Sequence, residues 1–121
     1  MKKMVKPEIK FLSKSQETVI PRRIHLTKST NGETGTATFI FVYPILFSLM
    51  KENSFEKIQE MNLLWENKKI STTDITIFFK QGKPTIIRSI LIFKNSTEWF
   101  NFLSFMNCYC KETGLSFSEG N

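Results

Sequence analysis

The pattern that most constrains the fold is an amphipathic helix near the C-terminal end of the sequence, at residues 96–113. Asn95 is a preferred N-cap residue, and Glu98 stands three positions later, as in a capping box. Gly114 is the residue type that most often ends a helix. At about 100° per residue, an arc of about 160° contains the apolar side chains Trp99, Phe102, Leu103, Phe105, Met106, Tyr109 and Cys110. A stripe this wide faces a hydrophobic core, so the rest of the chain has to provide a surface that covers it.

The rest of the sequence has the pattern of short β-strands separated by turn residues. Segments in which β-branched and aromatic residues are frequent occur at residues 8–12, 22–28, 36–43, 61–65, 74–80 and 85–93. Asn31-Gly32 and Gln81-Gly82 are typical of tight hairpin turns. Two short helices are expected at residues 45–51 and 54–61. We therefore predict an α+β domain, in which a mainly antiparallel β-sheet of hairpins carries the C-terminal α-helix on one face.

The net charge is unevenly distributed along the chain. The chain has 121 residues and a formal net charge of +6, and residues 1–28, with eight basic and two acidic groups, carry all of it. We expect a single domain over residues 1–121, in which residues 1–7 form a flexible basic N-terminus. This asymmetry favours an anionic partner, such as an acidic protein surface, anionic lipid or nucleic acid, although a solvated arm would have the same composition.

No segment has the pattern of a membrane span or a targeting sequence. The longest nearly apolar stretch, residues 39–50, is 12 residues long and contains Pro44, whereas a membrane span needs about 20 residues. The first 14 residues lack the apolar segment of a signal peptide and the Ser and Arg content of a transit peptide. Any contact with a membrane is therefore expected to be peripheral.

Residue types that carry out catalysis or bind metals are scarce. His25 is the only histidine, and a single strand histidine is usually structural or solvated. Cys108 and Cys110 are two positions apart, so they point to different sides of a helix and are poorly placed to share a metal. Two cysteines are too few for a disulfide scaffold and favour a reducing compartment. We expect no catalytic residues, no cofactor and no metal, and hence a protein that is not an enzyme.

The candidate partner-binding residues are therefore on the surface. In residues 22–28, apolar and charged side chains alternate, which predicts one buried and one exposed face. The exposed face and its flanks contain the candidate residues Arg22, Arg23, His25 and Lys28. We expect this segment to be an edge strand to which a partner adds a strand, unless residues 8–12 already cover it.

Phe100 is a further candidate for partner binding. It lies outside the apolar stripe, among polar residues of the predicted helix, and is expected to be exposed. Together with the apolar residues 44–50 it would form a contact patch.

A small basic RNA-binding module is the alternative function. Phe39 and Phe41 could stack on bases, but no basic-glycine motif of the RNP type precedes them. Core packing is the more frequent role of phenylalanine in such a strand. Nucleic acid is therefore not the expected partner.

Two blocks of residues resemble the Psb28 family, also called the photosystem II reaction-centre W protein. The first consists of Leu26-Thr27-Lys28-Ser29, Gly32, Gly35-Thr36-Ala37-Thr38-Phe39 and Phe41. The second consists of Gln81-Gly82-Lys83-Pro84, Ile87, Glu98-Trp99, Phe102, Phe105-Met106, Tyr109 and Gly114-Leu115-Ser116-Phe117. The two blocks span nearly the whole chain.

The resemblance implies a non-enzymatic assembly or biogenesis factor of photosystem II. Members of this family are soluble proteins, without a cofactor, that bind the cytosolic or stromal face of photosystem II intermediates near the larger inner antenna chlorophyll protein. It implies photosystem II core subunits as partners and a peripheral location on the stromal side of the thylakoid membrane, and it leaves self-association open. The frequent Phe, Ile, Lys and Asn, which have AT-rich codons, are typical of a plastid-encoded algal member.

Overall fold

The computed structural model describes residues 6–12, 19–29, 34–42, 58–115 and 118–120. These residues form eight strands and one helix, with the bounds β1 Glu8–Leu12, β2 Arg23–Lys28, β3 Gly35–Val42, β4 Glu60–Trp65, β5 Lys68–Thr72, β6 Ile75–Lys80, β7 Lys83–Phe93, α2 Ser96–Thr113 and β8 Ser118–Gly120.

The helix predicted at residues 45–51 lies outside the described residues. The helix predicted at 54–61 lies partly outside them, and its last two residues, Glu60 and Met61, instead begin β4, so the prediction is wrong there.

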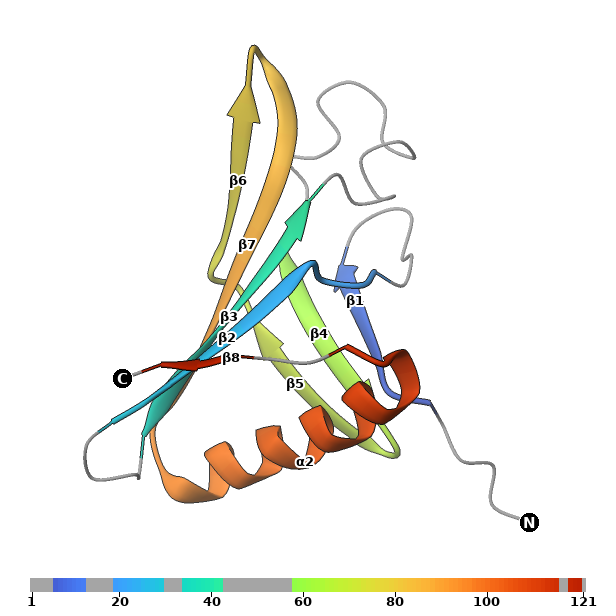
Figure 1. Cartoon of the computed structure of the whole chain (residues 1–121), viewed down its shortest axis with the longest axis vertical. Helices are drawn as coiled ribbons and strands as arrows, with labels where there is room; N and C mark the ends of the chain where they lie inside the picture. Colours follow the sequence, from blue (N-terminus) through green and yellow to red (C-terminus); the bar gives the residue numbers. More distant parts are fainter. Residues whose placement is uncertain (1–5, 13–18, 30–33, 43–57, 116–117, 121) are drawn as a thin grey trace.

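The strands form two sheets instead of the single sheet that the sequence suggested. Three strands pair in the order β1-β4-β5, and five pair in the order β6-β7-β3-β2-β8. Every pair is antiparallel except β2 with β8, which is parallel. In Figure 1 strand β7 runs from the top of the molecule to α2 at its base. The α+β class and the mainly antiparallel arrangement are thus confirmed.

Strand β2 is not an edge strand, which corrects one expectation. It pairs with β3 on one side, and on the other His25 lies opposite Ser118 and Thr27 opposite Gly120 of β8. Strand β1, which could have covered this edge, pairs with β4 in the other sheet. The prediction that a partner adds a strand at residues 22–28 is therefore wrong, because the chain's own C-terminal segment already occupies the centre of that edge.

Helix α2 has the bounds and the caps that its sequence predicts. The Oδ1 atom of Asn95 accepts a hydrogen bond of 3.0 Å from the Glu98 backbone N–H, and the Glu98 carboxylate accepts one of 2.8 Å from the Lys94 N–H. At the other end, Gly114 adopts a left-handed conformation with φ 73°, and its N–H donates to the Cys110 carbonyl oxygen. Local hydrogen bonds thus fix both ends of the helix.

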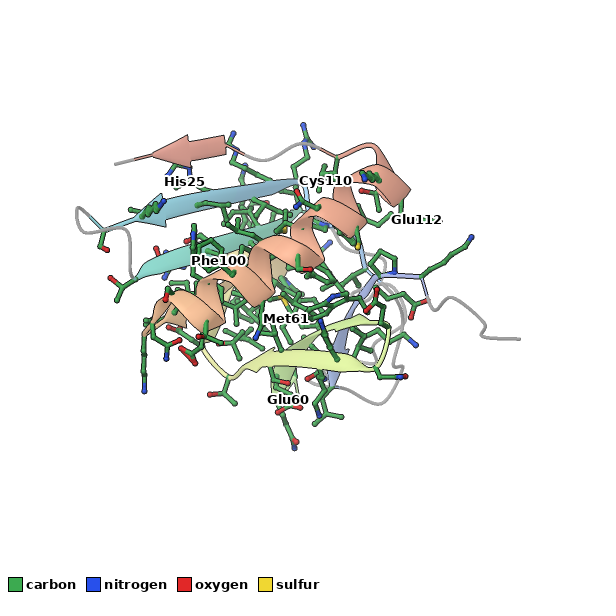
Figure 2. All side chains as sticks on the ribbon, turned by 90° about the horizontal axis from the view of Figure 1, so that it is seen from below. His25, Glu60, Met61, Phe100, Cys110 and Glu112 are labelled. Carbon is green, nitrogen blue, oxygen red and sulfur yellow. The ribbon has the colours of Figure 1, made fainter. Side chains whose placement is uncertain are left out.

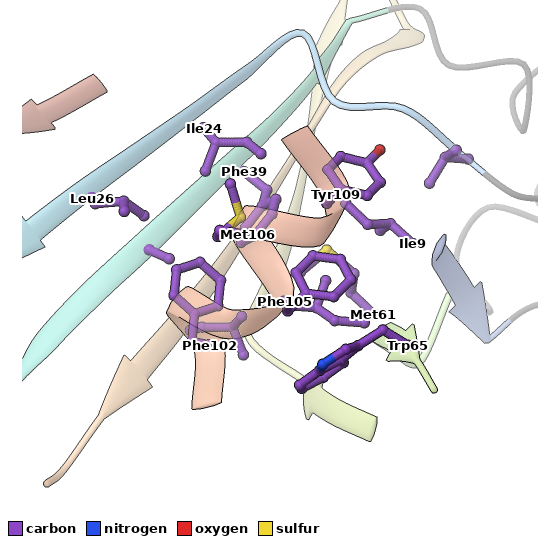
Figure 3. Packing of buried hydrophobic residues seen from close by; sticks show 14 of the residues in the cluster. Ile9, Ile24, Leu26, Phe39, Met61, Trp65, Phe102, Phe105, Met106 and Tyr109 are labelled. Atoms are coloured by element: carbon purple, nitrogen blue, oxygen red, sulfur yellow. The ribbon is translucent and has the colours of Figure 1, made fainter. Parts of the chain in front are cut away.

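Aromatic rings fill the space between α2 and the two sheets. Phe102 of α2 packs edge-to-face on Phe39 of β3, with ring centroids 6.1 Å apart, and Trp65 of β4 contacts Phe105 of α2 at 5.2 Å. Figure 3 shows these rings converging from the helix and both sheets. Phe39 and Phe41 are fully buried. The core interpretation of these two rings is confirmed, so they do not form a stacking surface for bases.

Candidate docking face

Strand β7 is apolar on both of its faces. Its inner face, toward α2, has the buried side chains of Ile87, Ser89, Leu91 and Phe93. Its outer face has Ile86, Arg88, Ile90 and Ile92. A strand that is apolar on both faces is typical of a sheet covered on both sides. Of the described elements, however, those that pack on this sheet through aromatic contacts lie against its inner face.

Strand register arranges the outer side chains in rows across the sheet. In one row, Ile40 of β3 has Arg23 of β2 on one side and Arg88 of β7 on the other. The neighbouring rows are formed by His25, Thr38 and Ile90, by Thr27, Thr36 and Ile92, and by Val42, Ile86 and Phe78. We call these four rows the outer face. Its central strand β3 contributes only uncharged side chains, and two guanidinium groups flank the apolar Ile40 at its centre.

The outer face ends at Ile92, whose side chain is strongly exposed. Ile92 is 62% exposed and is the last outward-facing residue of β7. Two surface grooves, of about 290 and 260 Å³, both include Ile92 and Phe93 in their linings. An exposed apolar ridge between two grooves is a shape that a protein partner can cover.

Arg88 combines an aromatic contact with an unused hydrogen-bond donor. Its guanidinium carbon lies 5.0 Å from the centroid of the Phe78 ring, a cation–π contact. Its Nε atom is buried and has no hydrogen-bond partner among the described residues. A buried donor of this kind usually finds an acceptor, and a carboxylate or a carbonyl oxygen of a partner would supply one.

Three of the sequence-predicted site residues lie together at the start and centre of β2. Arg23 and His25 are exposed on the outer face. Arg22 immediately precedes β2, and its backbone N–H donates a hydrogen bond of 2.7 Å to the Ile40 carbonyl oxygen. Lys28, at the far end of the strand, is exposed as well.

Phe100 is exposed as expected but belongs to a different surface. Its side chain is 65% exposed, on the side of α2 that faces away from the core. Figure 2 shows Phe100 on the helix and His25 on the strand behind it. The apolar residues 44–50, predicted to lie beside Phe100, are outside the described residues. The structure therefore does not bring Phe100 together with the basic residues of β2.

Sequence reasoning missed Arg88 and the outer isoleucines of β7. The available indication was the nearly continuous apolar run over residues 86–93, which lacks the alternation of a half-exposed strand. Such a run predicts that both faces of the strand are covered, but it does not identify what covers them.

The described residues offer contact surface more readily than reactive groups. No three metal-ligating side chains gather within the described part of the chain. Cys108 and Cys110 are partly buried thiols outside any disulfide, and burial raises the pKa of Cys110. Burial, with a smaller contribution from the nearby Cys110, raises the pKa of Tyr109. None of the described helices is both long and apolar enough to cross a bilayer.

Comparison with known proteins points to one family. The family model described as Psb28 protein matches residues 9–117. The photosystem II reaction center Psb28 protein of Rippkaea orientalis is 40% identical over 112 residues, which cover 93% of this chain and 95% of the relative. Its counterpart in Cyanidioschyzon merolae is 38% identical over 111 residues, covering 92% and 96%. That of Guillardia theta is 37% identical over 116 residues, covering 93% and 96%. The similarity extends over nearly the full length of each pair.

Proposed function

The chain belongs to the Psb28 family, and on this premise we propose that it is a non-enzymatic assembly or biogenesis factor of photosystem II. The single observation that carries the proposal is the family match over residues 9–117. The relatives it resembles are described as photosystem II reaction center proteins. The proposed place of action is the stromal side of the thylakoid membrane, in a plastid, where the protein associates peripherally with assembly intermediates near the larger inner antenna chlorophyll protein.

The outer face is the proposed contact surface for these intermediates. Arginine is enriched in protein interfaces, and Arg23 and Arg88 flank the apolar centre of the face. A partner's acceptor atom would supply a hydrogen bond to the unpaired Nε of Arg88. The same partner would remove the exposed Ile92 side chain from water. Basic residues at the start of β2 favour an acidic segment on that partner.

Affinity isolation tests the proposal directly. A tagged version of the full chain, recovered from detergent-solubilised thylakoids, is expected to bring down photosystem II core subunits, including the larger inner antenna chlorophyll protein, without the mature oxygen-evolving proteins. Recovery of RNA without photosystem II subunits would instead favour the RNA-binding alternative. Recovery of neither would contradict the proposed function.

A matched pair of variants identifies the contact surface. Ile92 and Phe100 are 62% and 65% exposed, on the outer sheet face and on the outer side of α2, respectively. Neither Ile92→Ser nor Phe100→Ser should change the free energy of unfolding by more than about 0.5 kcal/mol, because both side chains are already solvated. We expect Ile92→Ser to lower the recovery of photosystem II subunits and Phe100→Ser to leave it nearly unchanged. The reverse result would assign docking to the helix and contradict the role of the outer face.

A further inference from the structure

The end of the β6–β7 hairpin combines exposed aromatic rings with basic side chains. Phe78 and Phe79 are 40% and 50% exposed, and Lys80 and Lys83 are exposed on the two sides of the turn. We call residues 78–83 the hairpin tip. This segment contains no acidic residue, and neither does any other part of residues 75–88.

Backbone geometry presents the two rings on a narrow ribbon. Gln81 and Gly82 have φ angles of 53° and 78°, as a two-residue hairpin turn with both central residues in the left-handed region requires. The register shifts between Phe78 and Phe79, and a bulge of this kind increases the local twist of the ribbon. Since successive side chains of a strand point to opposite faces, the tip carries an aromatic ring on each of its faces.

The hairpin tip occupies one end of the molecule. In Figure 1 it lies at the top of the longest axis, whereas α2 lies at the base. It is continuous with the outer face, because Phe78 shares a row with Ile86 and Val42. A surface that meets the tip can therefore lie beside a protein that covers the outer face.

We propose that the hairpin tip docks on an anionic lipid surface, an inference that rests on the proposed role beside a membrane-embedded complex. Phe78 and Phe79 would enter the boundary between headgroups and acyl chains, and Lys80 and Lys83 would contact anionic headgroups. Within the described part of the chain, neither lysine forms an ion pair with a carboxylate. Both ammonium groups are therefore available to an anionic surface, which attracts clustered basic residues.

The chemistry of the hairpin tip favours lipid over protein as the occupant. Lysine is depleted in protein interfaces relative to the rest of the surface. Its long aliphatic stem can instead lie along apolar groups while the ammonium reaches the headgroups. Two lysines beside two exposed phenylalanines, without a carboxylate nearby, match the surface of an anionic bilayer in charge and in polarity.

Vesicle binding by the purified full chain tests the inference without any photosystem II present. The probes are vesicles of phosphatidylcholine alone and of phosphatidylcholine with phosphatidylglycerol in equal amounts. We expect cosedimentation with the anionic vesicles and much weaker binding to the neutral ones. Binding to the anionic vesicles should fall as salt rises, because the Debye length shrinks to about 3 Å at 1 M. Absence of binding, or equal binding to both vesicles, would overturn the proposal.

Two variants separate the basic and aromatic contributions. The double change Lys80→Gln with Lys83→Gln is expected to lower partitioning onto anionic vesicles by about 30-fold. Phe79→Ser, at the ring that lies outside the outer face, is expected to lower it by about fivefold. The matched control, Lys69→Gln with Lys94→Gln, removes the same charge from two exposed positions outside the hairpin and should have little effect. An equal loss in the control would mean that net charge alone drives binding, and would overturn the assignment to the hairpin tip.

The same variants distinguish this inference from the proposed function. If the lysine variant loses photosystem II subunits from detergent extracts but binds anionic vesicles normally, the hairpin tip contacts protein and the lipid proposal fails. If the wild-type chain binds anionic vesicles but recovers no photosystem II subunits, the lipid proposal stands and the proposed function fails.

Discussion

Arg23 and Arg88, far apart in the sequence, lie in one row of the outer sheet face on opposite sides of Ile40. No carboxylate of the described residues pairs with either guanidinium group. The row therefore places two positive charges beside the apolar Ile40, an arrangement that favours an acidic partner. The outer face thus combines Arg23, from the basic segment of residues 1–28, with the apolar side chains of β7.

The first prediction follows from this row. The double variant Arg23→Gln with Arg88→Gln should associate with photosystem II complexes roughly tenfold more slowly at low salt, because charges of this kind steer encounter. The measurement is an association rate at several salt concentrations on immobilised complexes. A Lys94→Gln with Lys111→Gln variant, which removes two positive charges from exposed positions outside the outer face, serves as its control. Unchanged association kinetics in the arginine variant would contradict an electrostatic role for the row.

A second prediction concerns the buried hydroxyl of Tyr109. Its side chain is 1% exposed, its oxygen has no hydrogen-bond partner among the described residues, and burial raises its pKa. An exposed tyrosine in the unfolded chain loses its proton near pH 10, whereas the folded chain keeps it. The unfolded state is therefore favoured as pH rises above about 10, by up to about 1.4 kcal/mol per pH unit.

Tyr109→Phe isolates this effect. The variant should lose less stability than the wild type between neutral pH and about pH 11, since it has no proton to release at this position. Chemical unfolding at each pH measures the difference. The lysines also titrate in this range, but they do so equally in both proteins. Parallel stability curves for the two proteins would show that the Tyr109 hydroxyl ionises alike in the folded and unfolded states.

The sequence predicted most of the local structure and only part of the candidate site. The bounds of α2 follow from Asn95, Glu98 and Gly114, which act through hydrogen bonds within a few residues. Strand β5, residues 68–72, was missed because it is polar and is stabilised by its hairpin with the preceding strand β4. Strand β8, residues 118–120, was missed because it is very short and is stabilised by pairing with the distant strand β2. Arg23 and His25 were recognised by alternation along one strand. Arg88 was missed because its neighbourhood exists only once β2, β3 and β7 are in register.

A third prediction concerns the close approach of β3 to α2 at Gly35. A Cβ atom at this position would lie 2.8 Å from the Thr27 carbonyl oxygen and 2.9 Å from the Trp99 ring. Both neighbours are part of the packed structure, so Gly35→Ala should lower the free energy of unfolding by about 1–3 kcal/mol. Gly82→Ala at the hairpin turn is the contrast, since it meets no atom within 4 Å and should cost only about 1 kcal/mol through its positive φ. If Gly35→Ala and the wild type unfolded at the same denaturant concentration, the Trp99 ring would have to move to make room for the added methyl group.

The last prediction tests the pairing of β2 with β8, on which the correction of the edge strand depends. Within His25–Thr27, alternate backbone amides point toward β3 and toward β8. In the full chain all of these amides should be protected from hydrogen exchange. In a chain that ends at residue 117, those that face β8 should exchange at least about tenfold faster, because they become exposed to water. The amides that face β3 remain paired in both chains and are the internal control, so global destabilisation would be recognised by their parallel loss of protection.

If the shortened and full chains exchange alike at every amide of β2, then β8 does not protect this strand in solution. The edge would then be open to a partner's strand after all, and docking by strand addition at β2 would again compete with docking through the outer face.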